Sequence, residues 1–297
     1  IALLIIENIT TKYTCVTLII GENVKIRQVI MPIMPKGSKP LRILHLSDLH
    51  LRKTSYFQKN FLPKLNPSNY DFVIVTGDFI SSNDGIDIFL KYCSNLTSLP
   101  GFYVFGSNDY YEPSFKNPLK YLIRDDGKRK LGKELPWRGL QKSLTQLGWF
   151  DLNHQKSTLK INDTIIEVRG TDDAHLNRDT YEKVNGKPKN CDISIGITHA
   201  PYMRLINAMA EDQLDLIFAG HTHGGQVRLP WFGESKALTT NCDLPLWRSR
   251  GLTKVKNQPW LNVSAGMGTS PFARIRLASP PEVSLLTLQC LDISIHH

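Results

Sequence analysis

Asp and His residues recur directly after apolar segments of this sequence, at spacings that suit a metal site. Four such segments are followed by Asp48, His50, Asp78, His199, His221 and His223, and a fifth is followed by Gly106-Ser107-Asn108-Asp109. Short runs rich in Ile, Val, Leu and Phe are typical of buried strands. Ligands bind at the carboxyl ends of strands in open α/β sheets, so the sequence predicts that these side chains meet at one edge of a sheet.

Two of these motifs have the spacing of a chelating pair. In extended backbone, Asp48 and His50, or His221 and His223, would project from the same face, because side-chain direction alternates with period two. Carboxylate and imidazole together suit Zn, Mn, Fe and similar divalent ions, and a central carboxylate can bridge two of them. One such residue alone would be an ordinary core or turn residue. Five compatible motifs together predict a metal site.

In this order the motifs resemble the calcineurin-like metallophosphoesterases, whose pattern is D-x-H, G-D, G-N-H-[DE], a later His and G-H-x-H. The resemblance covers about residues 41–288. The stretch G-H-T-H-G-G-Q-V-R-L-P at 220–230 and the late Pro280-Pro281-Glu282 look like the bacterial branch of small membrane-associated or exported phosphoesterases.

The resemblance implies an α/β (α+β) four-layer fold with two facing mixed sheets flanked by helices. It also implies two divalent metal ions (Mn, Zn, Fe or Mg) and hydrolysis of a phosphodiester, pyrophosphate or phosphomonoester by a metal-activated hydroxide. Asp48, His50 and His223 would hold the first ion, and Asp78 would bridge both. The two other histidines would hold the second ion, with an amide oxygen from the third motif.

The third motif departs from the family pattern. Ser107 falls where the ligating Asn is expected, and Asn108 falls where the family has a His thought to protonate the leaving group. Either Asn108 reaches the second metal after a small backbone adjustment, or Ser107 or a water takes that position. An amide oxygen is the better ligand for a hard cation, which favours Asn108. The catalytic candidates are therefore Asp78, Asn108 and His199.

Either alternative leaves the usual general acid missing, because an amide does not donate a proton at neutral pH. His175 is a candidate acid or an ordinary surface-loop histidine. Good leaving groups depend less on an acid, so diester or pyrophosphate substrates are favoured over alkyl monoesters. His45 is expected in the core or behind the ligands, and Asp109 either orients a ligand or caps a turn.

The elements expected to position these residues alternate along the chain. Strands are expected at residues 41–46, 72–76, 101–105, 164–168, 193–198, 216–219, 260–263 and 283–288, and helices at 86–96, 140–147 and 203–210. The alternation predicts sheets covered by helices. A hairpin at 156–168, turning at Asn162-Asp163, indicates that the sheets are mixed. Residues 112–133 read as a surface insertion.

Length and composition fit one large domain, with 297 residues of which 41% are hydrophobic. We expect a phosphoesterase domain over 41–297, after an N-terminal segment and linker over 1–40, with the linker itself at 31–40. The apolar stub at 1–6 is either a first strand or the remnant of an anchor or signal. Five scattered cysteines, with no C-x-x-C pair, predict reduced thiols.

A formal charge of +9 suits an anionic membrane face or another polyanion, although a solvated surface explains it as well. We expect a phosphate-ester substrate that could be lipid-linked, a monomeric state, and membrane association or otherwise a cytoplasmic location. Nucleic acid is the less expected partner. A nuclease or cyclic-nucleotide phosphodiesterase is the alternative enzyme, with a basic groove at Lys116, Tyr121, Arg124, Lys128, Arg129 and Lys130. A catalytically silent metal-dependent binding module is the alternative outside the enzymes.

Overall fold

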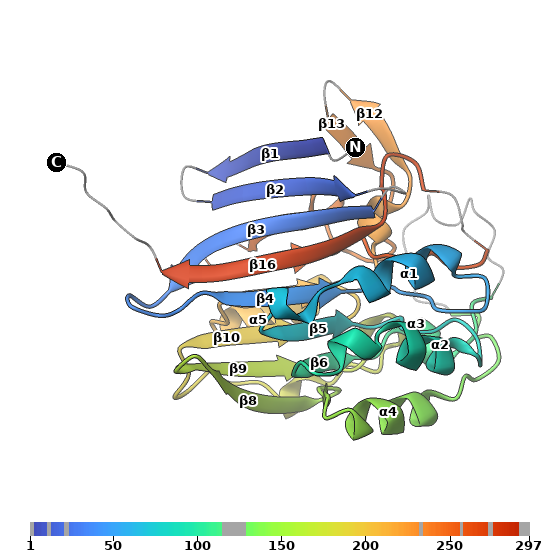
Figure 1. Cartoon of the computed structure of the whole chain (residues 1–297), viewed down its shortest axis with the longest axis horizontal. Coiled ribbons are helices and arrows are strands. Elements are labelled where there is room, and N and C mark those ends of the chain that lie inside the picture. The colour runs from blue at the N-terminus through green and yellow to red at the C-terminus, as the bar shows by residue number, and fades with distance from the viewer. Residues whose placement is uncertain are drawn as a thin grey trace.

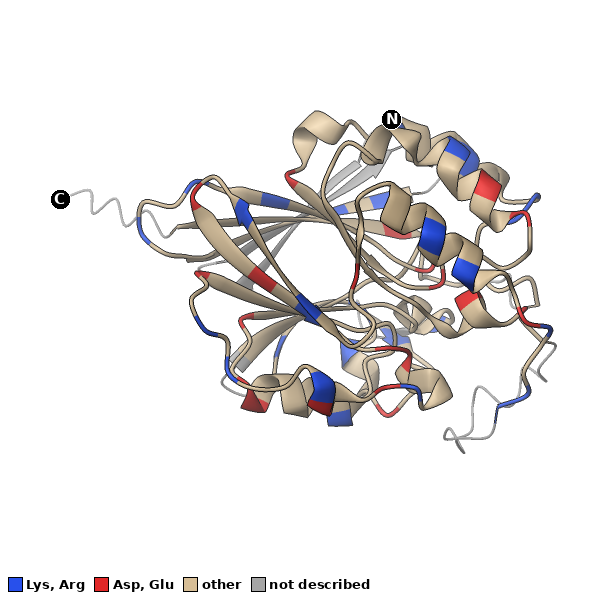
Figure 2. Cartoon of the chain, turned by 90° about the horizontal axis from the view of Figure 1, so that it is seen from below, with Lys and Arg blue, Asp and Glu red and all other residues tan. Residues whose placement is uncertain are grey.

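Two β-sheets face each other in the computed structural model of the chain, with helices on the outer faces of both (Figures 1 and 2). The structure describes residues 3–10, 13–20, 24–114, 129–231, 234–255, 258–272 and 276–290. One sheet has eight strands and the other has six, and each contains parallel and antiparallel pairs. This arrangement confirms the expected four-layer α/β fold.

The larger sheet places the first three motifs. Its order is β1-β2-β3-β16-β4-β5-β6-β7, with β1 at Leu3–Thr10, β2 at Tyr13–Ile20, β3 at Val24–Met34, β16 at Glu282–Cys290, β4 at Leu41–Leu46, β5 at Phe72–Thr76, β6 at Gly101–Val104 and β7 at Phe150–Asp151. Strands β4 to β7 are parallel, so their carboxyl ends lie at the same edge.

The smaller sheet places the last two motifs. Its order is β14-β15-β11-β10-β9-β8, with β14 at Gly251–Val255, β15 at Gln258–Val263, β11 at Leu216–Ala219, β10 at Ile193–Ile197, β9 at Thr164–Gly170 and β8 at Gln155–Ile161. The expected hairpin is β8 and β9, and both turn residues have positive φ, 49° at Asn162 and 66° at Asp163, as a type I′ turn requires. A separate ribbon of β12 (Arg228–Trp231) and β13 (Glu234–Ala237) follows the G-H-T-H motif.

Three apolar layers hold the sheets and helices together, because successive strand residues face opposite sides. The layer between the sheets includes Ile43, Ile74, Phe102, Ile195 and Phe218. Helices α1 (Tyr56–Phe61), α2 (Gly85–Tyr92) and α4 (Trp137–Gln146) cover the larger sheet, where Phe61, Phe89 and Leu140 join Leu44, Val73 and Tyr103. Helix α5 (Met203–Glu211) covers the smaller sheet with Ile206 and Met209. The strand ends are therefore anchored in a packed core.

The expected elements are found with small shifts at their ends. Strand β6 ends at Val104, helix α2 ends at Tyr92 with a separate 3-10 turn at Ser94–Leu96, and α4 begins at Trp137. The linker expected at 31–40 is wrong at its beginning, since β3 continues to Met34. Pairing of β3 with β2 ends at Ile30, and beyond it β3 pairs only with β16. Pro32 therefore lies on a stretch with one unpaired edge, where a proline without an N–H is tolerated. The domain boundary at residue 40 stays a prediction.

The described part of the apolar stub belongs to strand β1. The insertion expected at 112–133 is closed at its base, where the Glu112 N–H donates to the Lys133 carbonyl at 2.8 Å. Its central residues 115–128, including Lys116, Tyr121, Arg124 and Lys128, lie outside the described residues. In the described ranges, no helix combines the length and apolar character needed to cross a membrane. Among the described cysteines, Cys93 and Cys191 are free thiols.

Candidate metal centre

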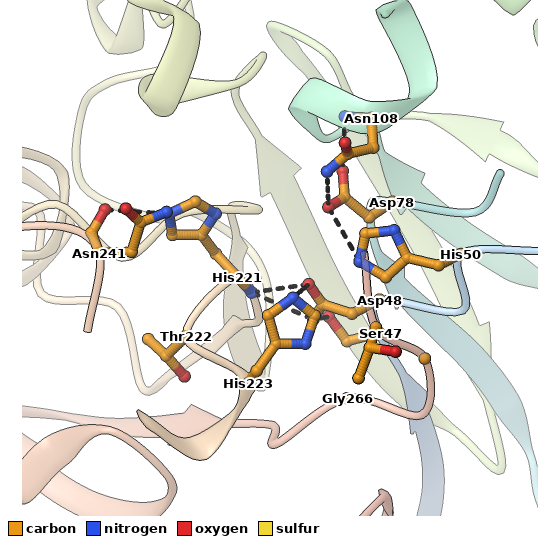
Figure 3. Close-up of polar contacts among 12 residues, drawn as sticks. Ser47, Asp48, His50, Asp78, Asn108, His221, Thr222, His223, Asn241 and Gly266 are labelled. Atoms are coloured by element: carbon orange, nitrogen blue, oxygen red, sulfur yellow. Dashed lines mark hydrogen bonds and ion pairs between the residues drawn. The ribbon is translucent and has the colours of Figure 1, made fainter. Parts of the chain in front are cut away.

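The carboxyl ends of five strands bring the motif residues together between the two sheets (Figure 3). Asp48 and His50 follow β4, Asp78 follows β5, and Asn108 lies in the short helix α3 (Ser107–Tyr110) after β6. On the facing sheet, His199 follows β10, whereas His221 and His223 follow β11. The structure thus gathers in one place every Asp, Asn and His residue that the sequence selected as a ligand.

Two groups of side chains have ligand atoms close enough to share an ion. Ligand atoms of Asp48, His50 and His223 lie within 4.8 Å of one another, and so do those of Asp48, Asp78 and His199. The Nε2 atoms of His50 and His199 are each 3.5 Å from Asp78 Oδ2. The first group is the set expected for the first ion, and Asp78 lies between the histidines of both sheets.

The backbone at these positions differs from the expected extended form. Asp48, His50, Asp78, His221 and His223 all have positive φ, between 47° and 68°. The argument from alternating strand side chains is therefore wrong, because the strands end before the motifs and the chain turns there. Left-handed backbone costs non-glycine residues about 1 kcal/mol or more each, and such strain concentrates at functional sites.

Long-range backbone bonds hold these turns. The Asp48 N–H donates to the Gly77 carbonyl at 3.0 Å, and the His50 N–H donates to the Asp78 carbonyl at 2.9 Å. A Cβ on Gly77, whose φ is 82°, would come within 2.6 Å of the Gly106 nitrogen. The loops after β4, β5 and β6 are therefore packed against each other through glycine, which fixes the ligand atoms on them.

His199 and His221 each direct one ring nitrogen toward the other ring. His199 Nδ1 lies 2.7 Å from the Thr76 carbonyl, and His221 Nε2 lies 3.1 Å from the Asn241 carbonyl. A carbonyl only accepts, so His199 Nδ1 carries a proton. His221 Nε2 lies between the Asn241 carbonyl and the Asn241 side-chain nitrogen, which is 3.3 Å away. When both rings are neutral and each holds its proton on the nitrogen that faces a carbonyl, the lone pairs of His199 Nε2 and His221 Nδ1 face each other across 3.3 Å. Two converging lone pairs fit a shared cation.

His50 offers a second fit to a cation. Its Nδ1 lies 2.9 Å from Ser81 Oγ, and its Nε2 is buried without a hydrogen-bond partner. A buried polar atom with no partner calls for an explanation, and a bound ion would supply one here. His223 differs, because Arg276 Nη2 lies 3.2 Å from its Nδ1. A guanidinium only donates, so ion binding through His223 Nε2 requires that this contact be broken.

The charges of the cluster favour a cation at the same place. Burial lowers the pKa of His199, but the carboxylates of Asp78, Asp48 and Asp173 outweigh it and raise that pKa to about 9. Burial, together with the nearby charge of Asp78, raises the pKa of Asp48 to about 6. A proton on His199 therefore holds the carboxylates together where an ion would.

Asn108 rather than Ser107 contacts the central carboxylate. Its backbone N–H donates to Asp78 Oδ1 at 2.8 Å, and its side-chain amide donates to Asp78 Oδ2 at 2.7 Å. Ser107 lines the pocket above these candidate ligands. Both readings of the third motif remain, but Asn108 is the residue against Asp78.

Asp109 holds the loops behind the ligands. Its carboxylate accepts the backbone N–H groups of Asp78 at 2.8 Å, Gly106 at 2.9 Å and Ile80 at 3.2 Å. Burial and the charge of Asp78 raise its pKa to about 8. Asp109 thus holds the loop of a candidate ligand and also caps α3. The two roles that the sequence offered as alternatives are both present.

His175 is not a surface residue. Its ring is buried, and the centroid lies 4.4 Å from that of His221. The surface-loop interpretation is therefore wrong, because the 3-10 turn at Ala174–Leu176 points the ring into the pocket. The sequence did not indicate Asn241 as part of the site. Its contact with His221 joins loops 20 residues apart, and no sequence pattern marks it.

The pocket over the candidate metal ligands carries groups from several loops. Its lining includes Asn108, Tyr111, Glu112, Arg129, Lys130, His175, Gln226, Thr239 and Asn241. Arg129 and Lys130 come from the end of the insertion. Arg129 donates to the His175 carbonyl at 2.7 Å and to the Tyr202 hydroxyl at 3.0 Å, so its guanidinium is held at the pocket wall.

Comparison with known proteins agrees with this geometry. The family model for calcineurin-like phosphoesterases matches residues 41–225. The uncharacterized metallophosphoesterase YkoQ of Bacillus subtilis is 25% identical over 252 residues, covering 83% of each chain. The UDP-2,3-diacylglucosamine pyrophosphatase LpxG of Chlamydia muridarum is 26% identical over 297 residues, covering 84% of each chain.

Among solved structures, TT1561 of Thermus thermophilus has a TM-score of 0.40 and 11% identity, covering 77% of this chain and 90% of that chain. The family model spans more than half of the chain and contains all six Asp and His positions together with the whole third motif. The chain belongs to the calcineurin-like phosphoesterase family and is a hydrolase of phosphoric esters.

Proposed function

We propose that this enzyme uses two divalent ions, Mn, Zn, Fe or Mg, held between its two sheets. Asp48, His50 and His223 hold the first ion, and Asp78 lies between both. His199, His221 and the Asn108 amide hold the second. The observation that carries the proposal is the 3.3 Å approach of His199 Nε2 to His221 Nδ1, a separation that suits two nitrogens sharing a proton or a cation.

When bound, the ions would activate a water for in-line attack and neutralise charge on the phosphoryl oxygens. The chain's own residues fix the geometry for that chemistry. Thr76 and Asn241 orient the two facing histidines through their carbonyls. Asn108 lies on Asp78, and a half-turn of its amide presents Oδ1 in place of Nδ2.

The substrate we propose is a phosphodiester or a pyrophosphate with a good leaving group. Asn108 stands where the family has its acid, and an amide does not protonate a leaving oxygen. Arg129 and Lys130 line the pocket beside the cluster, and two cations there suit a substrate with a second negative charge. The pyrophosphatase name of the LpxG relatives supports the same class, and a lipid-linked substrate is part of the proposal.

We further propose that the enzyme works as a monomer at an anionic membrane face, as the G-H-T-H-G-G-Q branch suggests. All seven proposed ligands come from one chain, so the centre needs no second copy. The formal charge of +9 favours an anionic surface, although Figure 2 shows Lys and Arg interspersed with Asp and Glu. Co-sedimentation with vesicles of phosphatidylglycerol, against phosphatidylcholine alone, tests this part.

The activity itself is tested with metal-stripped protein given Mn, Zn, Fe or Mg. Bis-p-nitrophenyl phosphate, p-nitrophenyl phosphate and a UDP-linked diphosphate are the main substrates, with single-stranded DNA and cyclic nucleotides for the alternative enzyme class. Metal-restored hydrolysis that favours diester and diphosphate, and that is lost in Asp78→Asn, supports the proposal. Two bound ions per chain without turnover of any substrate would instead support the binding module.

A further inference from the structure

A chain of buried hydrogen bonds connects strand β3 with the candidate ligand Asp48. Arg27 on β3 donates through Nη2 to Asn262 Oδ1 on β15 at 2.5 Å, and Asn262 Nδ2 lies 2.9 Å from His45 Nδ1 on β4. His45 Nε2 lies 2.9 Å from Thr76 Oγ1 on β5. Arg27 and Asn262 both lie outside the residues that the family model matches.

The last two links end on the carboxylate. Thr76 Oγ1 donates to Ser47 Oγ at 2.8 Å, and Ser47 Oγ donates to Asp48 Oδ2 at 2.6 Å. The His221 backbone N–H donates to both oxygens of Asp48, at 3.2 and 3.1 Å. Asp48 Oδ2 is therefore held by a side chain, and Oδ1 faces His223 Nε2 at 3.8 Å.

Every link in the chain donates in the same direction. Because Arg27 can only donate, the Asn262 oxygen must face it, and the Asn262 amide must donate to His45 Nδ1. Burial, with the charge of Arg27 adding to it, lowers the pKa of His45 to about 3, so the ring is neutral and its one proton is on Nε2. That proton is donated to Thr76. Asp48, at the far end, is the acceptor that completes the sequence.

The members of this chain are buried, with Arg27 6% exposed and Asn262, His45, Thr76 and Ser47 fully covered. Glu282 accepts from Arg27 Nε at 3.0 Å and compensates its charge. Replacing buried charged groups by apolar residues of similar volume is often neutral or stabilising. A contribution to the stability of the fold therefore does not by itself account for this network. Arg27 Nη1 is buried without a hydrogen-bond partner among the described residues, whereas the links from Asn262 to Asp48 are all made, and such a connected series of hydrogen bonds fixes one arrangement of its side chains.

We propose that Asn262, His45 and Thr76 are positioning residues that fix the rotation of the Asp48 carboxylate, so that Oδ1 points to the first ion. The inference rests on the proposed metal centre. It assigns to β3 and β15, outside the matched region, a part in metal affinity. These three residues orient Asp48 through Ser47, and none of them would touch the ion.

Thr76→Val tests the proposal, because it keeps the side-chain shape and removes the hydroxyl that joins His45 to Ser47. Thr76→Ser keeps the hydroxyl. Ser194→Ala is the matched control, since it removes a buried hydroxyl bonded to Asp215 at 2.7 Å near the amino end of β10. Mn affinity is measured for each full-length variant by isothermal titration and by electron paramagnetic resonance of free Mn, and folding is checked by urea unfolding.

We expect Thr76→Val to weaken one of two Mn sites by roughly 10-fold or more, the range seen when residues behind metal ligands are removed. Thr76→Ser should restore the affinity, and Ser194→Ala should leave it unchanged. Ser47→Ala removes the last hydrogen bond of the series, the one to Asp48. If Thr76 acts only through Ser47, the double variant Ser47→Ala/Thr76→Val should lose no more Mn affinity than Ser47→Ala alone.

Folded Thr76→Val with wild-type affinity for both ions overturns the inference. If Thr76→Val does not fold, Ser47→Ala takes its place under the same criterion. Failure of the metal centre gives a different result, because the wild-type chain itself would then bind no Mn.

Discussion

His221 Nδ1 lies 3.3 Å from His199 Nε2, and the other nitrogen of each ring faces a backbone carbonyl. Two ring nitrogens that face each other at this distance attract only when a proton or a cation lies between them. Asp78, Asp48 and Asp173 raise the pKa of His199 to about 9 in spite of its burial. The contact is therefore the point at which protons and metal ions compete.

Metal binding should release protons in a pH-dependent way. The raised pKa of His199 means that the metal-free protein holds a proton there at about pH 7.5, whereas a ligand nitrogen must be unprotonated. Release of about one proton per chain or more is expected at that pH, falling as the pH rises through about 9. Titration calorimetry in buffers of different ionisation enthalpy measures it. No release at about pH 7.5 would contradict this account of the cluster.

Asp109→Asn should lower the free energy of unfolding by about 1–3 kcal/mol, because one amide oxygen cannot accept all three backbone N–H groups that the carboxylate holds. Mn affinity should fall as well, since Asp78 is on one of the loops so held. Urea unfolding and Mn titration measure the two effects. Asp163→Asn, at a hairpin carboxylate that is 90% exposed, is the control and should change neither. Equal behaviour of the two variants would rule out this role for Asp109.

Gly106→Ala should lose metal-dependent activity at least about 10-fold. A Cβ there would collide with the Asp78 carboxylate and come within 2.7 Å of His199 Cε1. Gly139→Ala in helix α4 is the matched change, because its nearest neighbour would be Ile86 Cδ1 at 3.5 Å. That variant should keep full activity and gain about 0.5–1 kcal/mol of stability. Full activity of Gly106→Ala would show that the loops tolerate rearrangement.

Lys130→Ala should lower kcat/KM for a UDP-linked diphosphate by about 3- to 10-fold more than for bis-p-nitrophenyl phosphate. The reason is that Lys130 lines the pocket and would face the second phosphate. Lys160→Ala, at an exposed lysine of the β8–β9 hairpin, should affect neither substrate. The same loss on both substrates would assign Lys130 to general attraction of anions instead.

The strands that carry the candidate ligands were predictable because each is a short apolar run buried on both faces. Strands β4, β5 and β11 match their expected bounds, and the residues after them were identified correctly as converging. The end of strand β3 was not predicted, because a proline such as Pro32 is typical of a linker. That β2 no longer pairs with β3 beyond Ile30, which makes room for this proline, is visible only in the fold.

The details of the site were less accessible from sequence. Positive φ at Asp48 and His50 depends on backbone bonds to the loop after β5, which local pattern does not encode. His175, Asn241 and Asn262 reach the cluster, or the residues behind it, only through tertiary contacts. Residue types therefore predicted which side chains converge at the candidate metal centre, while the surrounding groups became apparent only from the fold.

The most direct test of the two-ion centre is an anomalous difference map from a crystal of the Mn-loaded protein. The account predicts two peaks: one bounded by Asp48, His50 and His223, and one bounded by His199, His221 and Asn108, with Asp78 between them. No peak at these residues, or a single peak that persists in Asp78→Asn, would contradict it.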